Sequence, residues 1–365
     1  MPVLVNYKFE LECNSRKYST NKTKTVVVDS SRIAKRYLSN KVIVLRPIID
    51  NMVIRYYFQD FPKNEHEDLE QMIKSYLVLH VKTTPSQYSD ISLYDAKKSK
   101  YRGFSQNIYF THKSSGATTL IQACPKKDKN GETKRPFLKI WLNPDEIGEK
   151  GMQEVRQLIL DMTVQTLTLD QILSHKKCIE RMDIAIDILG IAPEDLEIRG
   201  DLRDPKKVMQ VNSKTGRKQT YYVDYKPGTS TRTYLYDKRA ERLDSGQKPL
   251  YNGVQHTRVE HRVETTLAAN QLLKLKNHFK KIDIWAMDYS ALKCNGDHLY
   301  IFAIDYILRR TLQKAKQIFP DAASKVKCSQ AYYKARRNIW EPEALWDKNW
   351  HKVLKKSGLL PMNND

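Results

Sequence analysis

Two segments of this chain alternate apolar and charged residues with a period of two. In residues 181–188 the apolar set is Met182, Ile184, Ile186 and Ile188, and the other set is Arg181, Asp183, Ala185 and Asp187. In residues 256–265 the apolar set is Val259 and Val263, and the charged set is Arg258, Glu260, Arg262 and Glu264. Because successive side chains of a strand point to opposite faces, the pattern predicts two half-buried strands with one charged face each.

A third segment, residues 231–238, adds two tyrosines one strand step apart between two cations. As a strand it would place on one face Arg232, Tyr234, Tyr236 and Lys238. A phenol hydroxyl between cations is a candidate nucleophile toward a phosphodiester, because the cations hold the phosphate and favour the phenolate. The alternative is an ordinary strand in which Tyr and Thr satisfy β-propensity and the charges are solvated.

Pairing of these strands in one sheet would create a charged surface over an apolar underside. Asp183 and Asp187 lie roughly 13 Å apart along a strand at ~3.3 Å per residue, so they cannot share one cation, and the same limit separates Glu260 from Glu264. Cross-strand pairing favours Asp183 with Glu260, with Asp187 as an alternate or supporting group. Carboxylates suit Mg²⁺ or Mn²⁺, which polarise a scissile phosphate. Ion pairing between these acids and arginines, without a metal, is the alternative.

The charge balance points to a polyanionic partner. The 365 residues carry 63 Lys and Arg against 42 Asp and Glu, a formal net charge of +21, which favours nucleic acid. No apolar run approaches ~20 residues, and the N-terminus lacks the pattern of a secretory signal. Five cysteines without a Cys-x-x-Cys pair argue against a zinc site or disulfide framework and favour a reduced, cytoplasmic protein. No P-loop and no His-x-His pair is present.

The remaining patterns predict an α+β fold in three regions. We expect an N-terminal α/β region over 1–100 that contributes to DNA binding, a catalytic domain over 101–270 and a helical C-terminal region over 271–365. The predicted helices are 64–79, 151–172 and 299–319. The predicted hairpins are 106–111 with 118–123 and 206–211 with 218–224. A further strand over 137–142 ends at Asn143-Pro144.

Two groups of residues have competing interpretations. The loop of the second hairpin is basic, with Lys214, Arg217 and Lys218 ahead of a tyrosine-rich strand, which suits phosphate contacts and base stacking or an ordinary exposed hairpin. The tryptophans of the C-terminal region favour core anchoring over a stacking platform. They are Trp340, Trp346 and Trp350.

The motifs in this order resemble a known family. Arg-Met-Asp-Ile-Ala-Ile-Asp at 181–187, Tyr-Leu-Tyr-Asp-Lys-Arg-Ala-Glu within 228–242 and Arg-Val-Glu within 257–264 are similar to the replication initiation factors of rolling-circle plasmids and filamentous phages. This Rep_trans group also includes relaxases of some conjugative elements. The strand ending in Asn143-Pro144 is similar too, and the resemblance spans about residues 100–270. It implies a mainly antiparallel sheet with helices on one face, around an HUH-nuclease-like or RRM-like core.

The resemblance also implies a reaction. Tyr236 would nick one strand of origin DNA and form a 5′-phosphotyrosyl link, the free 3′-OH would prime synthesis, and a second transfer would rejoin the strand. Lys238 would contact the phosphate, Glu241 would serve as a base or further ligand, and Tyr234 complicates the choice of nucleophile. Asp183 and Glu260, with Asp187 less certain, would bind Mg²⁺ or Mn²⁺.

The same resemblance suggests partners and alternatives. The expected DNA-contacting residues are Arg232, Arg181, Arg258, Lys214, Arg217 and Lys218. The partners would be duplex and single-stranded origin DNA, a host helicase in a bacterial cytoplasm and a second copy in a dimer. A conjugative relaxase with the same chemistry and a non-catalytic, sequence-specific DNA-binding protein are the alternative functions.

Overall fold

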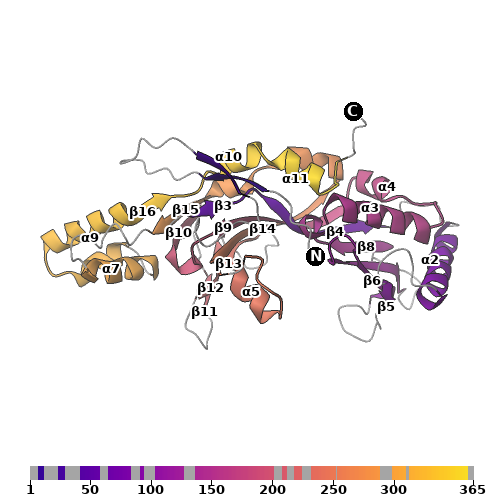
Figure 1. Cartoon of the computed structure of the whole chain (residues 1–365), viewed down its shortest axis with the longest axis horizontal. Coiled ribbons are helices and arrows are strands. Elements are labelled where there is room, and N and C mark those ends of the chain that lie inside the picture. The colour runs from indigo at the N-terminus through magenta and orange to yellow at the C-terminus, as the bar shows by residue number, and fades with distance from the viewer. Residues whose placement is uncertain are drawn as a thin grey trace.

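The computed structural model describes residues 7–11, 24–28, 42–57, 65–83, 91–93, 103–126, 136–200, 208–211, 218–223, 232–251, 253–287, 298–309 and 312–360. The chain forms an elongated molecule built on a long, twisted sheet, with helices α7 (His298–Arg309) and α9 (Ala322–Ala335) at one end and α2 (Glu65–Thr83) at the other (Figure 1). Within these ranges no helix is long and apolar enough to cross a membrane.

The main sheet is antiparallel at every described pairing and has eleven strands. Its order is β11 (Val208–Val211), β12 (Lys218–Val223), β13 (Arg232–Asp237), β14 (His256–Leu267), β9 (Ile179–Leu189), β4 (Ile48–Tyr56), β8 (Leu138–Leu142), β7 (Thr118–Pro125), β6 (Phe104–Thr111) and β5 (Ile91–Leu93), and β3 (Ile43–Val44) pairs with β9. β13, β14 and β9 therefore lie side by side.

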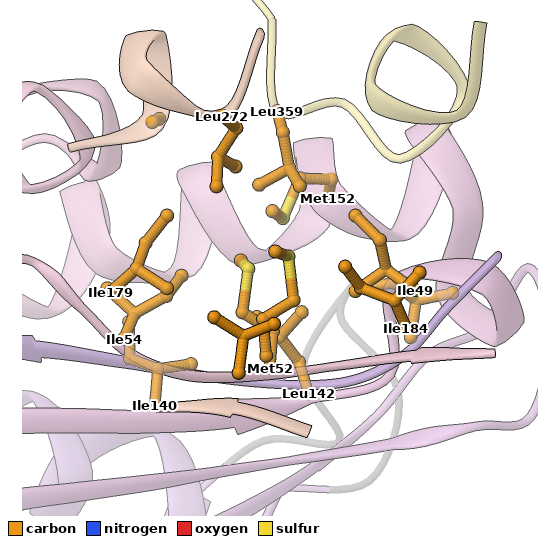
Figure 2. Close-up of a cluster of buried hydrophobic side chains, with 14 of the residues drawn as sticks. Ile49, Met52, Ile54, Ile140, Leu142, Met152, Ile179, Ile184, Leu272 and Leu359 are labelled. Atoms are coloured by element: carbon orange, nitrogen blue, oxygen red, sulfur yellow. The ribbon is translucent and has the colours of Figure 1, made fainter. Parts of the chain in front are cut away.

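Helices cover one face of this sheet. α3 (Pro144–Met162), α4 (Leu169–Ser174), α10 (Pro342–Asp347) and α11 (Trp350–Lys356) lie on one side, whereas α5 (Lys238–Asp244) lies on the other (Figure 1). Figure 2 shows the core between the sheet and the helices that include α3. Met52 and Leu142 of the sheet meet Met152 of α3, and Leu272 and Leu359 lie above them. All of these side chains are buried, so the helices fix one face of β4 and β9 by packing.

Two smaller sheets accompany the main one. β10 (Leu196–Gly200), β15 (Ile282–Met287) and β16 (Arg336–Asn338) form the first, and β1 (Tyr7–Leu11) pairs with β2 (Lys24–Val28) in the second. α7, α8 (Leu312–Ile318) and α9 enclose a separate small core. The described residues also include the short 3₁₀ helices η4 (Pro193–Asp195), η5 (Ala269–Lys274) and η6 (His278–Lys281).

The architecture confirms the predicted α+β class with a mainly antiparallel sheet, helices on one face and a helical C-terminal region. Both predicted hairpins form, as β6–β7 and β11–β12. The tryptophans are core anchors: Trp346 stacks on Trp350 with ring centroids 4.2 Å apart, and the Trp350 indole donates to the Leu272 carbonyl at 2.7 Å. The main sheet crosses the boundary predicted at residue 100, because β4 and β5 precede that residue in the sequence and β6 follows it.

Two predicted helices have different bounds. The helix expected over 151–172 lies in α3, which starts with a turn at Pro144 capped by the Asn143 side chain and is kinked at Gly148, where φ is positive. It ends at Met162, where Val164 and Gln165 take positive φ, and α4 is separate. The helix expected over 299–319 is two helices, α7 and α8. Apolar periodicity runs through such breaks, so the sequence pattern merges the segments.

Candidate active site

Register brings the three charged strands together in rows. Across β13, β14 and β9, Tyr236 lies opposite Arg258, which lies opposite Asp187. The next row on the same face is Tyr234, Glu260 and Ala185, and the third is Arg232, Arg262 and Asp183. In-register partners of an antiparallel pair share a face, so tyrosines, acids and arginines meet on one surface.

Tyr236 and Glu260 form a direct contact. The Tyr236 hydroxyl donates a hydrogen bond of 2.9 Å to Glu260 Oε2, a diagonal contact between neighbouring rows. The Glu260 side chain is only 11% exposed. A buried carboxylate that accepts the proton of a phenol has the geometry of a general base next to its nucleophile.

The charges around this pair set its proton affinity. Burial, then the negative charges of Asp183 and Asp50, raise the pKa of Glu260 to about 7. Burial and the Glu260 carboxylate also hold the pKa of Tyr236 far above its ordinary value. The expectation that flanking cations would favour the phenolate is therefore wrong for this structure: desolvation and carboxylates outweigh them. Tyr236 needs a base, and Glu260 is in contact with it.

Asp187 belongs to a buried charge network. Arg258 donates to both its oxygens, at 2.6 Å and 2.9 Å, and His256 Nε2 lies 3.0 Å from Oδ1. Burial by itself would raise the pKa of Asp187, but the Arg258 guanidinium and the His256 imidazole hold it far below the ordinary value. Arg258 is 2% exposed and also pairs with Asp50. Arg258, predicted to contact DNA, lies inside the protein and positions carboxylates.

Asp50 is a site residue that the sequence pattern missed. Ile49 lies opposite Ile184 and Asn51 opposite Asp183, so Asp50 is the extra residue of a β-bulge in β4. A bulge breaks the two-residue alternation and re-aims a side chain, here onto the charged side. Asn143, which caps α3 through Oδ1, donates to Asp50 through Nδ2 at 3.4 Å. The Asn-Pro step therefore ties the start of α3 to the site.

Asp183 is held by two arginines. Arg262 donates to its oxygens at 2.9 Å and 3.3 Å, and Arg181 donates to Oδ1 at 3.0 Å and pairs with Oδ2. Arg181 and Arg262 keep 23% and 25% of their side chains exposed, so their outer edges face solvent at the sheet surface. This arrangement matches the cross-strand ion pairing considered as the alternative to a metal.

The predicted ligand set does not fit a metal ion in this arrangement. Both oxygens of Asp183 and of Asp187 accept from guanidinium groups, and register separates Asp183 from Asp187 by two rows. Among the described residues, no group of three or more His, Cys, Asp or Glu side chains is arranged to hold a metal ion. Glu260 is the predicted ligand whose closest contact is a phenol rather than an arginine.

Lys238 and Glu241 lie on the turn that follows Tyr236. The strand ends at Asp237, whose side chain accepts from Ala240 N at 2.9 Å and caps α5, so Lys238 begins a helix rather than extending the strand. The Lys238 ammonium still lies 5.8 Å from the centroid of the Tyr236 ring, and 2.9 Å from Glu241. Glu241 is half exposed and pairs with Lys238, whereas Glu260 accepts the hydrogen bond of the Tyr236 hydroxyl.

Tyr234 has a different environment from Tyr236. Its ring packs edge-on against Tyr222 of β12, with centroids 5.2 Å apart, and the Arg262 guanidinium lies 5.3 Å from its centroid. Glu260 lies opposite Tyr234 in register, yet its hydrogen bond goes to Tyr236. Arg232 shares this face at the start of β13. Lys214 and Arg217 lie outside the described residues, and Lys218 begins β12.

The chain shows a weak structural likeness to a known protein. No protein-family model and no curated protein matches the chain. Among solved structures, the chain is similar to a rolling circle replication initiator protein from Geobacillus stearothermophilus, with a TM-score of 0.32 and 11% identity, over 63% of this chain and 78% of that one. A TM-score this low does not establish a shared fold.

Proposed function

We propose that this protein is a DNA nicking and joining enzyme that starts rolling-circle replication, with Tyr236 as nucleophile and Glu260 as its base. The observation that carries the proposal is the 2.9 Å hydrogen bond from the Tyr236 hydroxyl to a buried carboxylate whose pKa is raised to about 7. A base that titrates near the working pH can accept the proton and return it.

The reaction uses both atoms of that contact. Glu260 takes the phenol proton as the Tyr236 oxygen attacks phosphorus, the bond from phosphorus to the 3′ oxygen breaks, and that oxygen takes a proton to become a 3′-OH. The 5′ end stays on Tyr236 as a phosphotyrosine. Reversal of these steps with another 3′-OH rejoins the strand and returns the proton from Glu260 to Tyr236.

Cations at the rim of the site would hold the phosphate backbone. Arg181 and Arg262 keep solvent-facing edges on this surface, whereas Lys238, beside the Tyr236 ring, is only 11% exposed and would have to part from Glu241 to reach a phosphate. Guanidinium groups suit phosphate oxygens because their paired donors match two acceptors. A requirement for Mg²⁺ or Mn²⁺ stays part of the proposal without an assigned set of ligands, and is tested by leaving the cation out.

The C-terminal helices offer a separate surface for duplex origin DNA. The exposed residues from α9 into β16 include three cations, and the exposed acidic residue next to them is Asp321 at the helix N-cap. The set is Ala322, Ala323, Val326, Lys327, Gln330, Tyr333, Lys334 and Arg337. Such a face neutralises phosphates and carries polar groups that could reach base edges. A host helicase and a dimer remain further proposals from the family resemblance.

A covalent-adduct assay tests the nucleophile. A single-stranded origin oligonucleotide with Mg²⁺ or Mn²⁺ should give a protein–DNA adduct, seen as a shifted band on a denaturing gel. Tyr236→Phe should abolish it, because the ring remains and the attacking oxygen is gone. Tyr234→Phe is the matched control and should keep it. Adduct that survives in Tyr236→Phe and disappears in Tyr234→Phe would overturn the assignment.

The DNA next to the gene separates the two replicative alternatives. A hairpin-forming origin there supports replication initiation, and transfer genes there support a relaxase with the same chemistry. The absence of adduct with any candidate origin, while binding stays specific, would favour a non-catalytic DNA-binding protein.

A further inference from the structure

Tyr234 presents an aromatic surface beside the reacting tyrosine. Its side chain is partly exposed, its ring is braced by Tyr222 at 5.2 Å, and Arg262 lies 5.3 Å from the ring centroid. The Arg262 guanidinium is itself held by Asp183 at 2.9 Å. Ring, brace and cation are therefore fixed before any ligand arrives, which lowers the entropic cost of stacking on them.

The spacing of the two tyrosines matches a stretched single strand. Positions two apart on a strand are separated by about 6.7 Å, roughly twice the ~3.4 Å rise per base of a duplex strand. A phosphate bound at Tyr236 therefore leaves the adjoining nucleotide near Tyr234 with its base unstacked from its neighbour. Unstacked bases are what aromatic and arginine side chains recognise in single strands.

We propose that Tyr234, braced by Tyr222 and Arg262, is a stacking platform for the base next to the scissile phosphate. The proposal rests on the proposed nicking function, and it gives Tyr234 a positioning role instead of a second nucleophile. The bound strand would run along β13, with its reacting phosphate at Tyr236 and the next base against the Tyr234 ring.

Fluorescence anisotropy with a labelled single-stranded origin oligonucleotide tests the platform. Tyr234→Ala should weaken binding about 5- to 150-fold, the range that corresponds to ~1–3 kcal/mol for one stacked base. Tyr234→Phe and Tyr234→Trp should stay near the wild-type affinity, since both keep a flat ring. Tyr109→Ala, which removes a partly exposed tyrosine from β6, is the matched control and should change nothing.

An abasic scan separates stacking from a structural role. Replacing one nucleotide at a time with an abasic analogue should weaken wild-type binding at the position that meets Tyr234, and Tyr234→Ala should be insensitive at that position alone. Unchanged affinity in Tyr234→Ala, or an unchanged scan profile, would overturn the platform. If Tyr234→Ala fails to fold, the scan with Tyr234→Phe and Tyr234→Trp decides: loss of affinity in both contradicts stacking.

The two proposals fail differently. If the wild-type protein forms no adduct but binding still depends on the Tyr234 ring, the nicking function is wrong and the stacking platform stands. If the wild-type protein forms an adduct and Tyr234→Ala binds DNA as tightly as the wild type, only the platform is wrong.

Discussion

The two faces of the central strands use burial in opposite ways. On the helix-covered face, Ile184 and Met52 pack against α3 and are completely buried. On the other face of the same strands, Asp187 and Arg258 are almost as deeply buried but are charged. The apolar face is stabilised by removing hydrocarbon from water, and many substitutions of similar volume would satisfy it.

The charged face is stable only if each partner is present. Removing one charge from such a network leaves the other buried and unpaired, which costs more than the pair contributes. Glu260 differs, because its contact with Arg262 is as long as 3.8 Å and its closest contact is the Tyr236 hydroxyl; burial raises its pKa to about 7. On the charged face, arginines therefore pair with both Asp183 and Asp187, whereas Glu260 can gain or lose a proton near pH 7.

The largest expected effect is on the reaction at Glu260. Glu260→Gln should slow adduct formation about 10²- to 10⁴-fold, because a neutral amide cannot accept the tyrosine proton. In the wild type the rate should rise with pH through about 7, as Glu260 loses its own proton and becomes able to accept another. Single-turnover rates from pH 5 to 9 measure both.

The residual rate in Glu260→Gln should not show that rise. A wild-type profile that is flat, or that falls across this range, would contradict the base assignment. Ile184→Val on the apolar face is the control and should keep the wild-type profile.

The next effect is on stability, at Asp187. Asp187→Ala should lower the free energy of unfolding by about 3–5 kcal/mol, since Arg258 stays buried without its bidentate partner. Denaturant titration followed by circular dichroism measures the loss. The double change Asp187→Leu with Arg258→Met should lose less than Asp187→Ala, because it removes both charges. A loss below about 1 kcal/mol in Asp187→Ala would show that the network is not coupled as described.

The smallest effect is on the apolar face. Ile184→Val should lower the free energy of unfolding by about 0.5–1.5 kcal/mol, the ordinary cost of one buried methylene group, with adduct formation unchanged. The same titration and the same gel assay measure it. A change in rate larger than the change in stability would mean that the two faces are not independent.

The alternation of apolar and charged residues predicted much of the fold, but it predicted less of the candidate site. Alternation predicted β9, β13 and β14 with their faces, because period two is a local property of each segment. The same alternation placed both tyrosines and the three acids on charged faces, and the family resemblance selected Tyr236. Asp50 was not found, since it lies in a bulge, and His256 was not found, since a lone histidine at the start of a strand carries no pattern. The break between α3 and α4 was also missed.

The sequence by itself determined which side of each strand is charged and the basic excess. These follow from local geometry and composition. Only the tertiary structure decided which charge meets which. Register set Asp183 and Asp187 opposite arginines and placed Glu260 one row from Tyr236, close enough to accept its hydrogen bond. A two-residue change of register would have altered every pair while leaving every residue on its face, because the pattern records only the face of a residue and not its partner.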